Sequence, residues 1–298
     1  MDDWVRGGAA RVLQPLRRTF GRRNVNWTPE FMGFGNQLYL WCWAHERRHE
    51  APRPMVLINE RTRPWLPEVP GFAARFLVEA ADVSVLDRRD HYWSRKEAES
   101  GHPQGFSPQG RTDFIRQALL PEPLLAGVEE SPLNTDSSLT VVVRRGDFYV
   151  GQEHRNWYAF DVADYVRLAV AGAIERDGDV ERIHVVSDDV AWCREHLPFL
   201  EEHARVTWAG PSDTAASNFR DACGSRRLVI TNGTFCLWVA FISRTLHGQD
   251  PGKIWAPAFF QSTYGPGRCV EYDPDFSFVD ALPGGWQPEW VLDGQRHA

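Results

Sequence analysis

The chain has 298 residues, of which 43% are hydrophobic and 24% are charged, and its formal net charge at pH 7 is −7. This length and composition are typical of a globular protein with one large or two modest domains, which needs no disulfides or structural metal to fold. The acidic balance argues against nucleic acid as a partner, and no apolar run is long enough to span a membrane.

The first twenty residues combine apolar and basic side chains. Ala9, Leu13, Leu16 and Phe20 fall on one face of a predicted helix, with three arginines among them. A basic amphipathic helix of this kind either touches an anionic membrane surface or packs on the body of the protein. The segment lacks the apolar centre of a signal peptide. We therefore expect a cytoplasmic protein whose only membrane contact is peripheral, through residues 8–20.

A glycine-rich segment, Gly33-Phe34-Gly35-Asn36-Gln37, precedes an apolar stretch from residue 38 to residue 44. It is typical of a loop that opens a helix, where the backbone can approach a ligand and the helix N-terminus favours negative charge. Its spacing is that of neither the dinucleotide fingerprint nor the P-loop. Segments 55–58 and 83–86 are predicted strands, so the first half is predicted to be α/β.

The stretch from residue 88 to residue 113 is polar and rich in Gly, Pro, Ser and Gln, which is typical of a functional or disordered loop. A second cluster of Pro, Gly, Glu and Ser lies between residues 121 and 136. We place the domain boundary there and expect domains at 1–128 and 129–298.

The second half alternates between buried strands and helices, which predicts a parallel sheet covered on both faces. The predicted strands are 139–143, 182–186, 205–208, 227–231 and 253–256, and the predicted helices are 161–174, 190–197, 215–223 and 235–242.

Polar clusters follow three of these strands. They are Arg144-Arg145-Gly146-Asp147, Ser187-Asp188-Asp189 and Asn232-Gly233-Thr234. Each alone could be a turn or a helix cap. Because ligands of parallel α/β sheets bind outside the carboxyl ends of the strands, three clusters at one edge favour a ligand site.

The chemistry of these clusters suits a nucleotide diphosphate. A guanidinium fork such as that of Arg144 can bind phosphate oxygens with two nitrogens, and amides at Gly233 and Thr234 can cap the same oxygens. Asp188 can accept from a guanine base or from ribose hydroxyls. Arg145 is expected to pair with Asp147 and to hold the loop. A purely structural arginine–aspartate pair at the strand end is the alternative.

Three side-chain types bear on metals, disulfides and sugar binding. Adjacent carboxylates such as Asp188 and Asp189 can hold Mg²⁺ or Mn²⁺, but the arginine already supplies positive charge, so we expect no metal. The five cysteines, which are widely spaced without a CxxC pair, indicate neither a zinc site nor a disulfide framework. The thirteen tryptophans serve either the core or a ring-binding surface, and the core is the commoner use.

Five segments, in order from about residue 32 to residue 258, resemble motifs of the α-1,2-fucosyltransferases. In the first half, residues 33–38 resemble the family's Gly-x-Gly-Asn-Gln-Leu motif. In the second half, residues 142–148 resemble its His-x-Arg-Arg-Gly-Asp-Tyr motif, and residues 186–192 resemble its Phe-Ser-Asp-Asp-x-x-Trp segment. Farther along, residues 221–223 and 230–238 resemble its Asn-Ser-Ser-Phe-Ser-Trp-Trp region, and residues 253–257 resemble its Lys-x-x-x-Pro strand.

The resemblance implies a GT-B glycosyltransferase, in which two Rossmann-like domains face a cleft. The family moves L-fucose from GDP-β-L-fucose to a hydroxyl, usually of a galactoside, with inversion and without a metal or another cofactor. The first domain would mainly bind the acceptor and the second the donor. Carried over by motif, the donor and catalytic residues are Gly35 and Asn36 near the leaving group, Arg144 on the diphosphate, Ser187 and Asp188 in the nucleotide pocket, and Asn232, Gly233 and Thr234 along the phosphates.

The departures from the family leave alternatives open. Val142 stands where the family has His, Gly233-Thr234 replaces a Ser pair, and Leu237 replaces a Trp. The donor could therefore be a different sugar nucleotide, or the protein could be a catalytically silent nucleotide- or glycan-binding protein of the same fold. The catalytic base is open among Asp147, Glu153 and His154, and a dissociative mechanism needs little help from a base.

Overall fold

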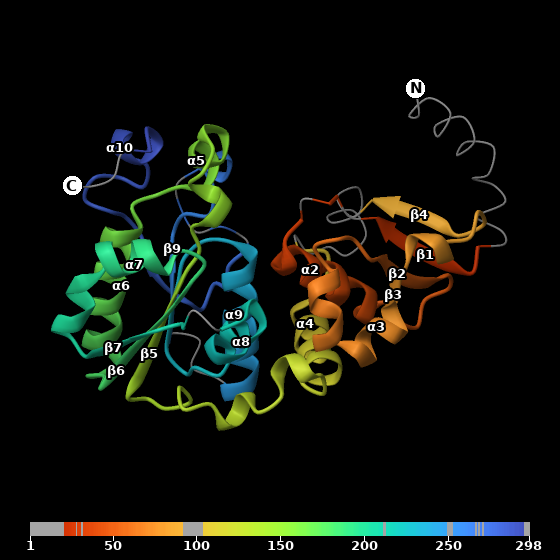
Figure 1. Cartoon of the computed structure of the whole chain (residues 1–298), viewed down its shortest axis with the longest axis horizontal. Helices are drawn as coiled ribbons and strands as arrows, with labels where there is room; N and C mark the ends of the chain where they lie inside the picture. Colours follow the sequence, from red (N-terminus) through yellow and green to blue (C-terminus); the bar gives the residue numbers. More distant parts are fainter. Residues whose placement is uncertain are drawn as a thin grey trace. The chain divides into compact units, whose positions relative to one another are not determined.

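The computed structural model describes residues 21–294, apart from residues 28, 31, 92–103, 211–212, 249–252, 266, 268 and 270. The helix expected within residues 8–20 lies outside these residues. The chain divides into two compact units, Met1–Ala126 and Gly127–Ala298, a division two residues from the expected one. Each unit is built around its own parallel sheet, which confirms the expected α/β class (Figure 1).

The first unit contains, within its described residues, a four-stranded sheet in the order β3-β2-β1-β4, with all neighbours parallel. Its elements are β1 (Arg23–Trp27), α2 (Phe34–Glu46), β2 (Arg53–Leu57), η1 (Arg63–Glu68), α3 (Pro70–Phe76), β3 (Leu77–Val78), η2 (Ala80–Asp82), β4 (Arg88–His91), α4 (Pro108–Phe114), the π-turn η4 (Ile115–Leu119) and η5 (Pro123–Leu125).

One predicted strand of this unit is wrong. Residues 83–86 form a turn, and Val85 and Leu86 are 64% and 39% exposed. The reason is Asp87, whose carboxylate accepts the Ser84 amide at 2.8 Å and the Arg23 guanidinium at 2.6 Å. These bonds stabilise a turn just before β4, which begins at Arg88.

The glycine-rich loop does open a helix, as expected, because α2 starts at Phe34 directly after Gly33. Nearly every face of α2 is buried, which explains its lack of a polar stripe. The burial includes Gln37, whose amide has no hydrogen-bond partner among the described residues. Asn26 of β1 is in the same state.

The second unit contains, in its described part, a six-stranded parallel sheet in the order β10-β9-β8-β5-β6-β7. All five predicted strands are confirmed, and β10 was not predicted. The strands are β5 (Ser138–Val143), β6 (Arg182–Ser187), β7 (Arg205–Trp208), β8 (Leu228–Ile230), β9 (Ile254–Pro257) and β10 (Ser277–Val279).

Helices cover both faces of this sheet, with α6 and α7 on one side and α8 and α9 on the other (Figure 1). The helices and turns are η6 (Val128–Glu130), η7 (Gly146–Phe148), α5 (Gln152–Tyr158), α6 (Val162–Asp177), α7 (Val190–His196), η8 (Pro198–Glu202), α8 (Ala215–Cys223), α9 (Thr234–His247), η10 (Ser262–Tyr264) and α10 (Glu289–Leu292). The four predicted helices correspond to α6, α7, α8 and α9.

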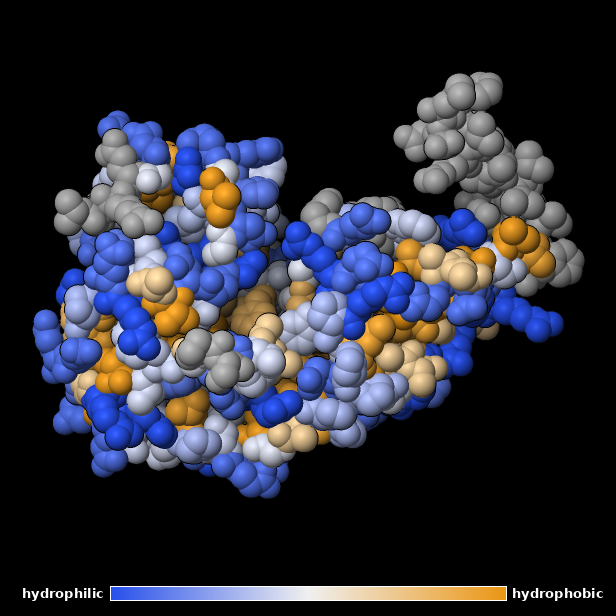
Figure 2. All heavy atoms as spheres, viewed as in Figure 1, coloured by the Kyte–Doolittle hydropathy of each residue, from blue (hydrophilic) through white to orange (hydrophobic). Residues whose placement is uncertain are grey.

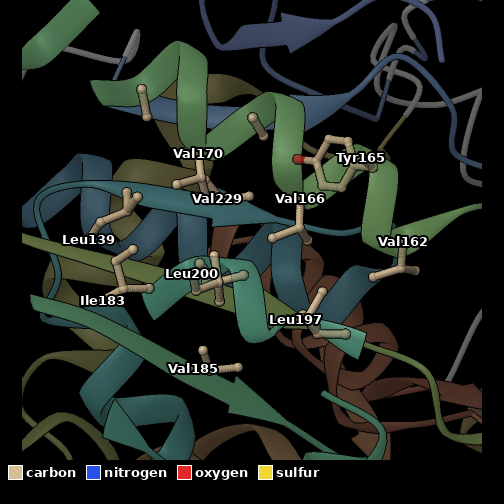
Figure 3. Close-up of a cluster of buried hydrophobic side chains, with 14 of the residues drawn as sticks. Leu139, Val162, Tyr165, Val166, Val170, Ile183, Val185, Leu197, Leu200 and Val229 are labelled. Atoms are coloured by element: carbon tan, nitrogen blue, oxygen red, sulfur yellow. The ribbon is translucent and has the colours of Figure 1, made fainter. Parts of the chain in front are cut away.

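The core beneath α6 shows why this half was predictable. Leu139 and Val141 of β5 and Ile183 and Val185 of β6 pack against Val166 of α6 (Figure 3). Residues two apart on each strand point to the same face, so continuous apolar strands can fill both sides of the sheet.

Arg227 connects several segments of the chain at the opposite, amino edge of the sheet. Arg227 is 1% exposed, and its guanidinium donates to the carbonyls of Ala173, Gly178, Asp136 and Asp179 at 2.9 to 3.5 Å. Burial lowers its pKa from the ordinary value.

The described surface carries few large apolar side chains, and on the face in Figure 2 they lie scattered among hydrophilic residues. Among the described residues, no helix combines the length and apolarity that a membrane span requires.

Candidate active site

The polar clusters predicted at the strand ends come together in the second unit. β8, β5 and β6 are neighbours in the sheet, so the segments that follow them meet at its carboxyl edge. Two of the clusters are joined directly, because Arg145 N donates to Asp188 Oδ1 at 2.8 Å, Arg145 Nε donates to Asp189 Oδ2 at 3.4 Å, and Arg144 makes a short bond to Asp188. Arg144 N also donates to Oγ1 of Thr231, the residue before the third cluster, at 2.8 Å. The expected convergence is therefore present.

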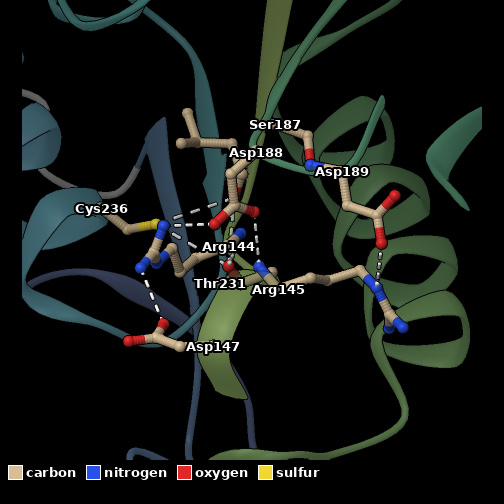
Figure 4. Close-up of polar contacts among 9 residues, drawn as sticks. Arg144, Arg145, Asp147, Ser187, Asp188, Asp189, Thr231 and Cys236 are labelled. Atoms are coloured by element: carbon tan, nitrogen blue, oxygen red, sulfur yellow. Dashed lines mark hydrogen bonds and ion pairs between the residues drawn. The ribbon is translucent and has the colours of Figure 1, made fainter. Parts of the chain in front are cut away.

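Arg144 follows β5 directly and lies between two carboxylates (Figure 4). Its Nη1 donates to Asp188 Oδ2, and its Nη2 donates to Asp147 Oδ1 at 2.8 Å. The side chain is 34% exposed, against 26% for Asp188 and 51% for Asp147. The guanidinium is thus oriented by the protein and still open to solvent.

The carboxylate of Asp188 connects two consecutive residues. One oxygen accepts from the Arg144 guanidinium and the other from the Arg145 amide. A Cβ at Gly146 would collide with Asp188 Oδ2, and Gly146 has a φ of +26°. Glycine is therefore needed there, both for the backbone conformation and for the approach of Asp188.

Arg145 is held in a different way from the one we predicted. Its guanidinium lies between the rings of Tyr149 and Trp192, at 3.9 and 3.7 Å, and its Nε is 3.4 Å from Asp189. The predicted pair of Arg145 with Asp147 is wrong, because the turn η7 brings Asp147 back to Arg144, three residues earlier. At 13% exposure, Arg145 serves the loop.

The hydroxyls behind Arg144 are engaged within the protein. Thr231 is fully buried, and its Oγ1 accepts from the Arg144 amide and donates to the Val142 carbonyl at 3.3 Å. Ser187 Oγ accepts from the Asp189 amide at 2.9 Å. Burial raises the pKa of the neighbouring Cys236 thiol to about 12, so Cys236 is a neutral core residue.

Asn232 is also engaged internally. It is 1% exposed, and its Nδ2 donates to the carbonyls of Tyr158 and Phe260 at 2.9 and 2.8 Å. Its side chain therefore holds the end of α5 and the segment at Phe260 against the end of β8. A direct contact of this side chain with the donor stays a prediction.

The start of α9 provides an anion-binding edge. Gly233 has a φ of +112° and precedes the first helical residue, Thr234, and as the N-cap residue it has no side chain that could cap the helix. The first amides of a helix lack partners within it and carry partial positive charge. Gly233 and Thr234 therefore suit the phosphate contact that we predicted for them.

Gly35 and Asn36 belong to the first unit, in the first turn of α2. Gly35 is buried and Asn36 is half-buried. Since they lie in the other unit from Arg144, their shared role at the leaving group stays a prediction.

The three candidate bases differ in their surroundings. Asp147 is paired with Arg144. Glu153 and His154 are exposed in the first turn of α5, and the Glu153 carboxylate has no polar partner among the described residues. In the part of the chain that the structure describes, no group of three or more His, Cys, Asp or Glu could hold a metal ion.

The sequence did not point to the aromatic side chains around this centre. Phe148 lies under Arg144, and Tyr149 and Trp192 enclose Arg145. Phe148 and Tyr149 directly follow the arginine cluster and Trp192 follows the aspartates. Aromatic residues just after the arginines of β5 and the aspartates of β6 are a sequence signal that could have indicated stacking of rings on an arginine side chain.

Comparison with known proteins gives a family match over the region that contains these residues. Residues 123–255 match the model of glycosyl transferase family 11. The protein is thus a glycosyltransferase, and the matched region contains both arginines and the Ser187 and Asn232 clusters. Over these residues the resemblance drawn from the motifs is confirmed. No curated protein matches the sequence.

Similar solved structures include three of POFUT1. A high-resolution complex with GDP has a TM-score of 0.45 and 10% identity and covers 75% of this chain and 95% of that one. A second GDP complex has a TM-score of 0.44 and 10% identity and covers 76% and 96%. The apo form has a TM-score of 0.43 and 8% identity and covers 79% and 97%.

Proposed function

We propose that this glycosyltransferase moves L-fucose from GDP-β-L-fucose to a hydroxyl of a galactoside acceptor, with inversion and without a metal. The observation that carries the proposal is Arg144, which is half-exposed at the carboxyl edge of a parallel sheet and oriented by Asp188. The family 11 match supports glycosyl transfer, and the motif resemblance supports fucose as the transferred sugar.

Arg144 and the start of α9 act on the leaving group. Breaking the bond from the sugar to the diphosphate adds negative charge to the phosphate and positive character to the sugar. A guanidinium that is fixed before the reaction stabilises the developing charge without having to reorganise. The first amides of α9, at Gly233 and Thr234, add hydrogen-bond donors.

Asp147 and Asp188 have different parts in this mechanism. Asp188 also accepts the Arg145 amide, so it stays in place and keeps Arg144 oriented. Asp147 is more exposed, and among the described residues its hydrogen-bond partner is Nη2 of Arg144. The incoming diphosphate takes over that nitrogen and releases the Asp147 carboxylate. We therefore assign Asp188 to the positioning of Arg144, in place of the guanine or ribose contact expected for it.

The test is the nucleotide preference. Calorimetry with GDP, UDP, ADP and CDP should show clear preference for GDP, and GDP-fucose should turn over on a panel of β-galactosides. Turnover should survive EDTA. Preference for UDP would contradict the proposal, and loss of activity in EDTA would contradict the metal-free mechanism.

A transferase that uses another sugar nucleotide is the alternative, and Val142 favours it. Its side chain is 2% exposed and apolar where the family has His. Binding of nucleotide or glycan without any turnover would instead indicate a catalytically silent protein.

A further inference from the structure

A group of aromatic side chains lies beside Arg144 in the second unit. Phe148 and Tyr158 stack with centroids 4.4 Å apart and an interplanar angle of 14°. Trp157 meets Tyr158 edge-on at 6.3 Å, and the His154 ring is 6.4 Å from each of them. We call Phe148, His154, Trp157 and Tyr158 the aromatic platform.

The platform begins at the reaction centre and runs outward from it. The Arg144 guanidinium lies 5.8 Å from the Phe148 ring, and a Cβ at Gly233 would touch the same ring. The Phe148 ring is thus already in contact with Arg144 and Tyr158. Burial first, and the Asp147 carboxylate second, raise the pKa of Tyr158, so this ring also lies near the catalytic charges.

The outer end of the platform faces solvent. Trp157 is 40% exposed, and Glu153, His154 and Asn156 beside it on α5 are exposed as well. A large exposed ring among groups that can hydrogen-bond suits a ligand with an apolar face and polar edges. A pyranose ring has this form, because its C–H groups gather on one face and its hydroxyls lie around the rim.

The helix that carries Trp157 is held rigidly. Asn232 Nδ2 donates to the Tyr158 carbonyl, Ser262 Oγ to the Asn156 carbonyl at 2.8 Å, and Gln287 Nε2 to the Ala159 carbonyl at 2.8 Å. These bonds cap the end of α5 from three separate loops. A ring on such a support loses little conformational freedom when a ligand stacks on it.

We propose that Trp157 is the outer wall of an acceptor subsite on the second unit and stacks on the apolar face of the acceptor's pyranose ring. This rests on the proposed function, because it needs a sugar acceptor. The donor sugar is bonded to the diphosphate and so lies beside Arg144. Trp157 lies farther out, beyond Phe148 and Tyr158, where the acceptor must approach.

The test compares Trp157→Ala with Trp157→Phe, using Leu168→Ala as the matched control. Leu168 is a 39% exposed apolar residue of α6, outside the platform. Trp157→Ala should raise the KM for a methyl β-D-galactopyranoside acceptor about fivefold, since stacking is worth about 1 kcal/mol. The affinity for GDP should stay within twofold, and Trp157→Phe should retain most of the acceptor affinity. Leu168→Ala should change neither.

An unchanged acceptor KM in Trp157→Ala, or an equal loss of GDP affinity, would overturn the subsite. Saturation-transfer NMR with methyl β-D-galactopyranoside measures binding without turnover. Signals that are present in the native protein and weakened in Trp157→Ala support the subsite, while equal signals, or none in the native protein, overturn it. Preference for UDP in calorimetry would defeat GDP-fucose as the donor and leave this result standing.

Discussion

Each unit has an arginine that bonds two carboxylates, and the two arginines differ in their place in the fold. In the first unit, Arg63 of η1 bonds Glu60 and Glu79 at 2.9 Å, and all three side chains are 40% exposed or more. In the second unit, Arg144 bonds Asp147 and Asp188 at the carboxyl edge of the sheet. Exposed ion pairs contribute little to stability. Pairing with two carboxylates therefore does not distinguish the two arginines. What distinguishes them is that Arg144 lies at the carboxyl edge of a parallel sheet, where ligands bind.

The largest effect should come from removing the guanidinium of Arg144. Arg144→Ala should lower kcat/KM by about a thousandfold, roughly 4 kcal/mol in the barrier, because a fixed donor at the developing charge is lost. Arg144→Lys should recover little, since lysine lacks the planar fork. Steady-state kinetics with GDP-fucose measures both.

Arg63→Ala is the matched control, because it removes an arginine with the same number of carboxylate partners. It should leave turnover within twofold and the unfolding free energy within about 1 kcal/mol. An Arg144→Ala variant with near-native activity would end the comparison.

Substituting the two aspartates that bond Arg144 should have smaller effects, which differ in sign for GDP binding. Asp188→Asn places an amide against Nη1, so Arg144 loses its orientation, and kcat should fall about ten- to a hundredfold with weaker GDP binding. Asp147→Asn removes a competitor of the diphosphate, so GDP should bind as tightly or tighter. Calorimetry with GDP gives the sign of each change. Equal losses in both variants would contradict the division of roles.

The smallest expected effect is a pH dependence of stability in the first unit, which distinguishes the buried His45 from an exposed histidine. His45 of α2 is buried near Phe76 and Phe114, and burial, with the Arg48 and Arg75 charges, lowers its pKa from 6.5 to about 4. The unfolded chain then binds more protons than the folded one between pH 6.5 and pH 4. Stability is therefore present above pH 6.5 and falls as the pH drops through this window, by about 1 to 2 kcal/mol from pH 7 to pH 5.

Urea unfolding at both pH values measures this loss. A His45→Leu variant should lose less stability on acidification, and a variant of the exposed His49, such as His49→Gln, should behave like the native protein. The same pH sensitivity in all three would assign the effect to other groups.

The two units also differ in how far the sequence predicts them. The second has apolar strands that end in polar clusters, so its strands, helices and ligand edge were predictable from hydrophobic pattern. In the first, β1 reads Arg-Asn-Val-Asn-Trp, with buried Asn24 and Asn26, and no such pattern indicates a strand. The partners of Arg144 and Arg145 depend on the turn η7, and the aromatic platform depends on side-chain orientation. Neither follows from residue order alone.

The position of Arg227 has a consequence for cooperativity. The carbonyls that it bonds come from residues 48 to 91 positions away along the chain. A partly assembled second unit would hold this cation in the core with its partners missing, which is strongly unfavourable. Intermediates in which α6 or β8 has separated from the sheet are thereby penalised. We therefore expect the second unit to unfold cooperatively, in one transition. The amino edge of its sheet then contributes to stability, while the carboxyl edge carries the residues for catalysis.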